Sequence, residues 1–236
     1  MSITLNKNLD TKQLAKAYQE KKRLQIPDFL EASGADKLFE VLTLKTPWQI
    51  TYNDGKKAIW QDVKELETKI GRRIREMTNL IFGNATKGDF QYIRYARLLK
   101  ENQTGMRPLD PVLVEAYDFL NGKEMRGFVK AVTGKSIRKT DAEAHWYKND
   151  NFQTRGTGAE MGNKRDIGFS LTLARNWSAD WGGNTYFYGQ DGSVGEVFVP
   201  QFNALEIFEI PASHSISMVT HYAGDFRVSI TGAFLS

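Results

Sequence analysis

The second half of this sequence alternates short β-type runs with turn residues. The runs are rich in aromatic and β-branched residues, and glycine, asparagine and aspartate separate them, as at Gly182-Gly183 and Gly224-Asp225. Many short strands at close spacing are typical of a β-sandwich or a β-barrel. We expect the strands at residues 137–147, 167–173, 184–188, 196–199, 204–210, 215–220 and 227–234.

The first half is mostly helical in its patterns. Apolar residues recur at helical spacing over residues 11–22, 31–44, 63–82, 108–121 and 124–132, and strand-like runs lie at 23–29, 48–52, 58–60 and 90–98. Asp10 and the pair Asp110-Pro111 are helix-start signals, and Gly134 is a stop signal. Pro27 predicts an edge position for the first strand.

Helices followed by strands predict an α+β fold in which the helices buttress one face of the sheet. The sequence contains no internal repeat and no low-complexity linker. We therefore expect a single domain over residues 1–236, with a mainly helical support region at 1–135 and the β core at 136–236.

Composition excludes several functions. The 236 residues contain no cysteine, so disulfides, thiolate metal sites and cysteine nucleophiles are absent, and histidine chemistry must use His145, His214 or His221. A net charge of +4 is too mild to predict nucleic-acid binding. No apolar run approaches the roughly 20 residues of a membrane helix, and the first ten residues do not resemble a signal peptide. We expect a cytoplasmic protein without a membrane partner.

Five motifs in the second half follow one another in a defined order. They are Tyr147 to Phe152, Asp180 to Gly183 with the strand Thr185 to Tyr188, Pro200 to Phe208, Ser213 to Val219, and Arg227 to Gly232. Each motif alone is weak, but their order resembles the prolyl-hydroxylase branch of the iron(II)/2-oxoglutarate oxygenases. The resemblance covers residues 141–236 well and implies a double-stranded β-helix, the jelly-roll fold of the cupins.

The resemblance also implies a site. In this family two histidines and one carboxylate bind one face of iron(II), and 2-oxoglutarate takes two of the remaining positions. The distal histidine corresponds to His214, which would be both the metal ligand and the catalytic centre. Arg227 corresponds to the arginine that clamps the far carboxylate of 2-oxoglutarate in a bidentate fork, assisted by Ser229 and by Tyr147.

The other two iron ligands of the family form a His-x-Asp motif after the first of these strands. Counting from Tyr147, their positions fall at Gly156 and Gly158. Glycine has no side chain with which to bind a metal, and one imidazole with a bidentate cosubstrate is a poor iron site. Glu160 is a possible replacement if its loop is remodelled, and His145 shares a strand face with Tyr147. His221 falls on the face opposite His214, and both His145 and His221 are otherwise expected to make ordinary hydrogen bonds.

Arg227 and a group of aromatic residues bear on what the protein could bind. If Arg227 points into the barrel, it needs an anion, either a bound carboxylate or an internal Asp or Glu, because an unpaired buried charge is costly. The aromatic residues Trp177, Trp181, Tyr186 and Tyr188 are candidates either for a substrate cleft or for core and turn packing.

Three functions are consistent with these residues. The first is an oxygenase-family enzyme that acts on a small amino acid or a peptidyl residue with altered or metal-poor chemistry. The second is a non-catalytic module that binds a carboxylate or serves as a scaffold. The third is an ordinary dioxygenase in which the two glycines were introduced to abolish metal binding. Substrate selectivity is expected in loops such as residues 160–166 and in the helical first half.

Overall fold

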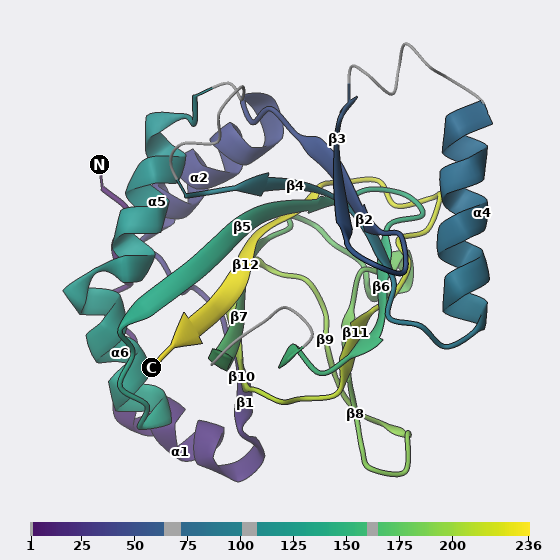
Figure 1. The fold of residues 1–236 in the computed structure, drawn as a ribbon. Helices are drawn as coiled ribbons and strands as arrows, with labels where there is room; N and C mark the ends of the chain where they lie inside the picture. Colours follow the sequence, from purple (N-terminus) through teal and green to yellow (C-terminus); the bar gives the residue numbers. More distant parts are fainter. Residues whose placement is uncertain (1, 64–71, 101–107, 160–164) are drawn as a thin grey trace.

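The structure, a computed structural model, describes residues 2–63, 72–100, 108–159 and 165–236 (Figure 1). Its helices are α1 (Thr11–Lys21), α2 (Ala32–Leu44), α4 (Arg72–Thr86), α5 (Pro111–Asn121), α6 (Lys123–Thr133) and the 3₁₀ turn η2 (Ala179–Trp181). The strands of the first half are β1 (Arg23–Ile26), β2 (Gln49–Asn53), β3 (Ala58–Asp62) and β4 (Tyr92–Leu98). Those of the second half are β5 (Lys139–Tyr147), β6 (Phe152–Gly156), β7 (Arg165–Leu173), β8 (Thr185–Tyr188), β9 (Val194–Phe198), β10 (Phe202–Glu209), β11 (His214–Ile216) and β12 (Arg227–Leu235).

The helix boundaries follow the predicted signals. The Asp10 carboxylate accepts hydrogen bonds from the backbone N–H groups of Lys12 and Gln13, and Asp110 caps α5 in the same way ahead of Pro111. Gly134 ends α6 in the left-handed conformation at φ +78°. Of the helix expected at residues 63–82, the part from Arg72 onward is α4, and residues 64–71 lie outside the described part.

All strands belong to one antiparallel sheet. Its order is β1-β10-β7-β12-β5-β4-β6-β11-β8-β9, with β2 beside β4 and β3 beside β2. The path curls so that two walls face each other: Thr185 of β8 donates a hydrogen bond to Glu206 of β10, and the rings of Phe187 and Phe208 lie 5.3 Å apart across the interior. The sheet is therefore a nearly closed barrel, and β1 lies at one edge as Pro27 predicted.

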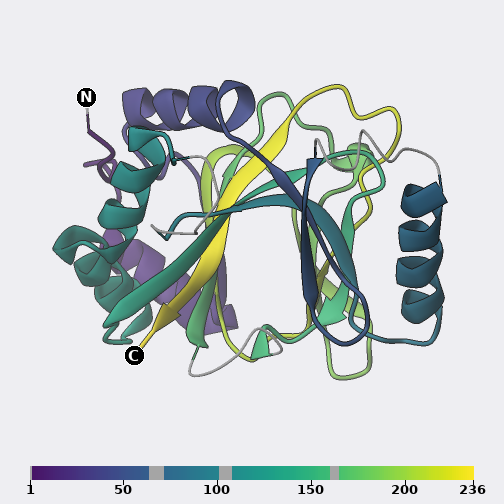
Figure 2. The same cartoon turned by 45° about the horizontal axis from the view of Figure 1, so that its top comes forward.

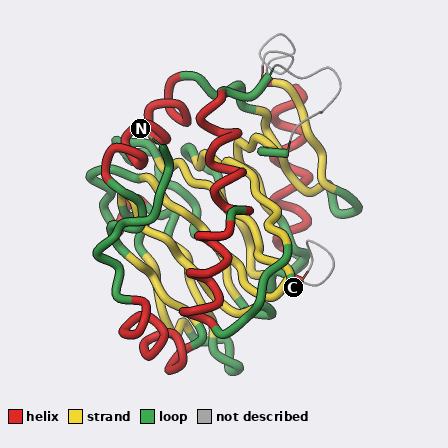
Figure 3. The backbone as a smooth tube through the Cα atoms, turned by 90° about the vertical axis from the view of Figure 1, so that its left-hand side faces the viewer, coloured by secondary structure: helices red, strands yellow, loops and turns green. Residues whose placement is uncertain are grey.

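Side-chain alternation gives the wall β5-β12-β7-β10 two different faces. Its outer face carries apolar side chains such as Leu171, Ile207 and Ile230, which are buried in the main core. Figures 2 and 3 show α1, α2, α5 and α6 gathered over this face. The predicted α+β fold, with helices buttressing the sheet, is confirmed.

The inner face of the same wall is polar, and its residues define the barrel interior. Thr172, Glu206 and Ser229 alternate with the apolar residues and are also buried. Buried polar groups need hydrogen-bond partners. A polar atom of this interior that has no hydrogen-bond partner therefore indicates where a ligand could bind.

Helix α4 lies apart from the other helices, against the far end of the barrel (Figure 1). Its residues Met77 and Ile81 pack with Ile50 and Tyr52 of β2 and Phe152 of β6 in a second, smaller apolar cluster. No helix in the described ranges is long and apolar enough to cross a membrane.

Two strand predictions need correction. Gly156, which lies between two of the expected strands, is the last residue of β6, a strand that sequence patterns missed because Gln153, Thr154 and Arg155 are polar. The strand expected at residues 215–220 ends at Ile216. Its partner β8 begins only after Gly182 and Gly183, whose φ angles of +75° and +66° turn the chain away and end the ladder.

Candidate functional site

A cavity of about 240 Å³ opens between the two walls of the barrel. It is bounded on one side by residues of β4, β5, β7 and β12, and on the other by β6, the segment after it and β11. Its polar lining comprises Arg94, Asp141, Glu143, His145, Gln153, Arg165, His214 and Thr231, with Lys100 and Lys139 also at its wall. The apolar part includes Phe169, Phe208 and Ile210.

His214 begins β11 and lines this cavity. Its Nδ1 atom lies 2.8 Å from the carbonyl oxygen of Ala212, which can only accept, so Nδ1 carries the proton. The Nε2 atom then presents its lone pair, 3.4 Å from the side-chain amide nitrogen of Gln153. The ring packs against Phe208 with the centroids 4.9 Å apart. A histidine whose other nitrogen is held by a carbonyl is oriented as metal-binding histidines are.

The two glycines of the predicted ligand positions lie beside His214. Gly156 pairs directly with His214 in the ladder between β6 and β11. Gly158 lines the same cavity at φ +83°, and a Cβ atom there would lie 3.4 Å from the side chain of Ile210. The positive φ favours glycine over aspartate. Their correspondence to the family's His-x-Asp residues stays a prediction.

The described residues do not fit the family's iron centre. No three His, Asp or Glu side chains in these ranges are arranged to hold a metal ion. Glu160, the possible replacement, lies outside the described residues. His145 faces the interior as expected, but its Nε2 atom is engaged by Glu143 and Arg94. His221 is on the surface, 3.1 Å from Asp150, in the ordinary interaction predicted for it.

Arg227 is fully buried at the start of β12, with 1% of its surface exposed. Its Nε atom donates a 2.7 Å hydrogen bond to the carbonyl of Gly183, and its guanidinium lies 4.5 Å above the ring of Tyr147, its partner on β5. Burial lowers the pKa of Arg227, partly opposed by Tyr147 and Glu206. The Arg227 Nη1 atom and the Tyr147 hydroxyl are both buried without a hydrogen-bond partner.

The turn at Trp181-Gly182-Gly183, within the motif Asp180 to Gly183, supports this arginine. Gly183 needs its positive φ, and a Cβ atom there would lie 2.6 Å from the Cδ atom of Arg227. Trp177 donates to the carbonyl of Gly182, and its ring packs against Trp181 at 5.3 Å. These tryptophans pack the turn, as one of the two predicted alternatives proposed.

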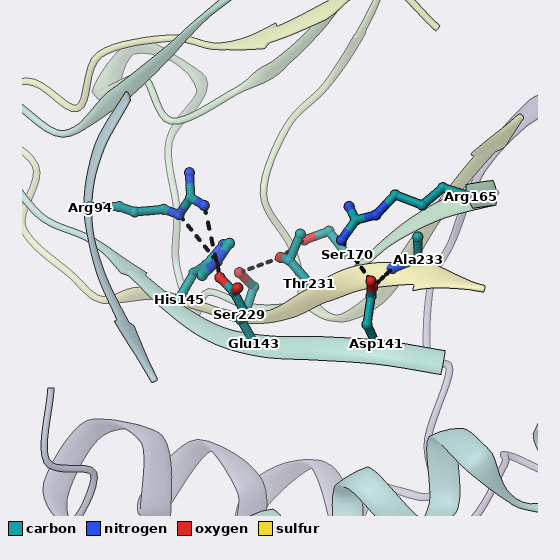
Figure 4. A network of polar contacts seen from close by, with 9 residues as sticks. All are labelled: Arg94, Asp141, Glu143, His145, Arg165, Ser170, Ser229, Thr231 and Ala233. Atoms are coloured by element: carbon teal, nitrogen blue, oxygen red, sulfur yellow. Dashed lines mark hydrogen bonds and ion pairs between the residues drawn. The ribbon is translucent and has the colours of Figure 1, made fainter. Parts of the chain in front are cut away.

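Ser229 follows Arg227 on the inner face of β12. Its hydroxyl lies 3.2 Å from that of Thr231, which lies 3.1 Å from the hydroxyl of Ser170 (Figure 4). Because Arg227 pairs with Tyr147 and Ser229 lies two residues further along β12, the three side chains share one face of the sheet. Their predicted role in binding 2-oxoglutarate stays a prediction.

Glu206, which sequence reasoning missed, lies in the same interior. Its carboxylate accepts hydrogen bonds from Thr185 Oγ1 at 3.0 Å and from Gln25 Nε2 at 3.4 Å. Burial raises its pKa to about 7, although the charge of Arg227 lowers it. The available signal was a charged residue inside the apolar run Ala204 to Phe208, on the inward phase of the alternation.

A second buried group was also missed: Arg94 with Glu143 and His145 (Figure 4). The His145 Nε2 atom lies 3.2 Å from Arg94 Nε and 3.0 Å from Glu143 Oε2, and Arg94 also lies over the ring of Tyr92 at 4.1 Å. Burial and then the charge of Arg94 lower the pKa of His145 to about 4, so the ring is neutral near pH 7. Its Nδ1 atom has no partner. Near the first residues of β5 and β7, the Arg165 Nη2 atom lies 2.7 Å from Asp141 Oδ2 (Figure 4).

Comparisons with known proteins agree with this architecture. The sequence model of the 2OG-Fe(II) oxygenase superfamily matches residues 142–235, from β5 to β12. No curated protein sequence matches the chain. A 2OG-Fe(II) oxygenase family oxidoreductase from Burkholderia pseudomallei superposes with a TM-score of 0.64 at 15% identity, covering 100% of this chain and 94% of that one.

Two prolyl hydroxylase structures are also similar. The prolyl-4-hydroxylase of Pseudomonas putida has a TM-score of 0.59 at 14% identity, with 96% and 98% of the two chains covered. A prolyl hydroxylase from Trichoplax adhaerens, in complex with a hypoxia inducible factor peptide, has a TM-score of 0.56 at 15% identity, with 95% and 88% covered. The chain thus has the double-stranded β-helix fold of these oxygenases, and the predicted fold and the predicted resemblance to the 2OG-Fe(II) oxygenase superfamily are confirmed.

Proposed function

We propose that this protein binds a small carboxylate, with 2-oxoglutarate as the first candidate, inside its barrel and does so without iron. One observation carries the proposal: the Arg227 guanidinium lies over the Tyr147 ring, and both the Arg227 Nη1 atom and the Tyr147 hydroxyl are buried and lack partners. A buried donor left unsatisfied costs about 1–3 kcal/mol, more when charged. A carboxylate ligand would accept from both.

The chemistry of the donors favours a carboxylate. A guanidinium matches a planar carboxylate with two parallel hydrogen bonds, and a phenol adds a third donor. The superfamily resemblance implies 2-oxoglutarate, whose far carboxylate the corresponding arginine binds.

The resemblance also implies iron(II), but of its three predicted ligand positions only His214 carries a metal-binding side chain, and no three such side chains among the described residues are arranged to hold a metal. If Gly156 and Gly158 correspond to the missing ligands, carboxylate binding must be independent of metal. Oxidation of an amino acid or a peptidyl residue at family rates would then not occur. The protein would act as a carboxylate-binding module that retains the oxygenase fold.

Isothermal titration calorimetry of 2-oxoglutarate in excess EDTA tests the proposal. The wild-type protein should bind with one site per chain, and Arg227→Gln should weaken binding by about 100-fold because a charge-assisted bidentate contact is lost. Arg75→Gln, on the exposed face of α4, is the control and should bind like wild type. Absence of binding by the wild-type protein would contradict the proposal.

The second candidate is an iron oxygenase with a rebuilt site, which the orientation of His214 Nε2 favours. Anaerobic iron(II) titration, metal analysis and succinate release from 2-oxoglutarate test it. Under our proposal, wild type binds no stoichiometric iron, and Gly156→His with Gly158→Asp gains iron affinity. Stoichiometric iron in wild type that persists in His214→Ala would instead establish a different metal site.

A further inference from the structure

Glu206 is a carboxylate that the barrel already contains. It lies in the middle of β10, with the outward side chains of Leu205 and Ile207 in the apolar core, and 1% of its surface is exposed. Gln25 of β1 and Thr185 of β8 hold its two oxygens from opposite walls. An isolated buried carboxylate is costly, so its charge state depends on what shares the interior.

Glu206 and Arg227 reach the same short segment of the chain. Arg227 donates to the carbonyl of Gly183, and Glu206 accepts from the side chain of Thr185, two residues later. Two residues span at most about 7 Å of chain. The guanidinium and the carboxyl thus approach the same segment, and each acts electrostatically on the other. No Arg227–Glu206 ion pair within 4.0 Å occurs among the described residues, and Nη1 has no partner.

A ligand carboxylate at Arg227 would bring a second negative charge next to a single buried cation. When two carboxylates share one buried site, the pKa of one of them is strongly raised. We propose that Glu206 takes up a proton when a carboxylate ligand binds Arg227, so that Glu206 determines the pH range over which the site accepts anions. This inference rests on the proposed function. It goes beyond that function because it names the residue that determines how ligand affinity depends on pH.

Glu206 is suited to this role because burial has already raised its pKa to about 7. Further negative charge nearby can only raise it more. The Glu206 carboxyl is therefore the group that can become neutral at the smallest free-energy cost when the ligand binds near neutral pH.

Among the described residues, Arg227 is the charged group that acts on Glu206. Gln25 from β1, Thr185 from β8 and Ser170, opposite on β7, are neutral. Tyr147 from β5 lies beyond the guanidinium of Arg227, which it stacks against.

Other charged side chains near the described interior have partners of their own, as Arg165 and Asp141 have in each other. Arg23, two residues before Gln25 on β1, lies 3.7 Å from Glu196 and over the ring of Phe187. Glu143 on β5 belongs to the group of Arg94 and His145.

Calorimetry of 2-oxoglutarate in EDTA, between pH 6 and pH 8 and in two buffers of different ionisation enthalpy, tests the inference. The ligand's carboxylates are ionised throughout this range. Wild type should bind about tenfold more weakly at pH 8 than at pH 6 and take up nearly one proton per ligand at pH 8. Glu206→Gln keeps both hydrogen-bond partners and should bind with no pH dependence, about tenfold more tightly than wild type at pH 8. Glu209→Gln, on the same strand, should keep the wild-type profile.

The outcomes separate the two proposals. Binding by wild type without pH dependence or proton uptake overturns the role of Glu206 and leaves carboxylate binding intact. No binding by wild type or Glu206→Gln at any pH overturns both. Loss of binding in a folded Glu206→Gln, judged by circular dichroism, shows that Glu206 is a required contact and also overturns the inference. The proton-uptake measurement needs no variant, so it decides the question even if Glu206→Gln fails to fold.

Discussion

Two buried arginines face the interior of this barrel, and they differ in how completely they are satisfied. Arg94 on β4 contacts His145, Glu143 and the ring of Tyr92, and none of its nitrogens is buried without a partner among the described residues. Arg227 on β12 has one backbone acceptor and a ring, and leaves Nη1 unpaired.

The difference distinguishes a structural charge from a ligand anchor. The Glu143 carboxylate already pairs with Arg94, so Arg94 needs no external anion. Arg227 makes no ion pair with the carboxyl that acts on it, that of Glu206. A buried donor without a partner is costly enough that an external acceptor gains from binding it. We therefore expect substitutions at Arg94 to act on stability and substitutions around Arg227 to act on ligand binding.

The largest effect is expected for Arg94→Ala. It leaves Glu143 and His145 without their cation, and breaking a buried pair costs about 3–5 kcal/mol. Because the Glu143 side chain is 23% exposed, we expect the lower end, about 3 kcal/mol, from urea denaturation. Arg75→Ala, on the exposed face of α4, should change the free energy of unfolding by less than about 0.5 kcal/mol. A loss below about 1 kcal/mol for Arg94→Ala would remove the basis of the comparison.

The second effect is a pH dependence of the free energy of unfolding, to which His145 and Glu206 contribute with opposite signs. The folded pKa of His145, about 4, is below its ordinary 6.5, so the unfolded chain binds the extra proton and stability falls as the pH drops from 6.5 to 4. The folded pKa of Glu206, about 7, is above its ordinary 4.5, so stability falls as the pH rises from 4.5 to 7.

Glu206→Gln removes the titrating carboxyl, so the pH dependence of stability that remains should include that of His145 without the opposing one of Glu206. Relative to wild type, its free energy of unfolding should increase by about 2 kcal/mol between pH 5 and pH 7.5. Urea denaturation at both pH values measures this change. An equal difference between the two proteins at both pH values would show that the Glu206 carboxyl titrates normally.

A third test moves Arg227 without changing it. Gly183→Ala adds a Cβ atom 2.6 Å from the Arg227 Cδ atom, so the guanidinium must shift, and we expect about tenfold weaker binding of 2-oxoglutarate. Gly134→Ala is the matched control, because its φ is also positive but its Cβ would meet nothing within 4 Å. Both variants should lose about 1 kcal/mol of stability to backbone strain. Equal affinities would mean that the position of Arg227 does not matter for binding.

The smallest effect is expected for Tyr147→Phe. The ring stays over the guanidinium and one neutral donor is lost, so binding should weaken about fivefold, or about 1 kcal/mol. Stability should be retained, because the hydroxyl has no partner to lose. Tyr18→Phe removes another buried, unpartnered hydroxyl, outside the barrel, and should leave binding unchanged. Equal affinities of Tyr147→Phe and Tyr18→Phe for 2-oxoglutarate, measured by calorimetry, would exclude Tyr147 from the site.

Much of the fold could be predicted from local patterns. The caps at Asp10 and Asp110, the end of α6 at Gly134 and the order of the second-half strands depend on neighbouring residues, which the sequence displays directly. Strand β6 was missed because its side chains are mostly polar, since they face the barrel interior or solvent rather than an apolar core.

The candidate site was only partly predictable. His214, Arg227, Ser229 and Tyr147 were found because they lie in recognisable motifs. Arg94 and Glu206 lie in no motif, and only pairing across the sheet brings them next to His145 and Arg227.

The sequence by itself determined the alternation that makes one sheet face apolar and the other polar, and it determined that residues 156 and 158 carry no side chain. Only the tertiary structure decided that Gly156 pairs with His214, that Arg94 is satisfied, and that Glu206 lies beside Arg227 without reaching it. The physical reason is that strand phase is a local property with a period of two, whereas the charge balance of a barrel interior depends on side chains that approach one another from distant strands.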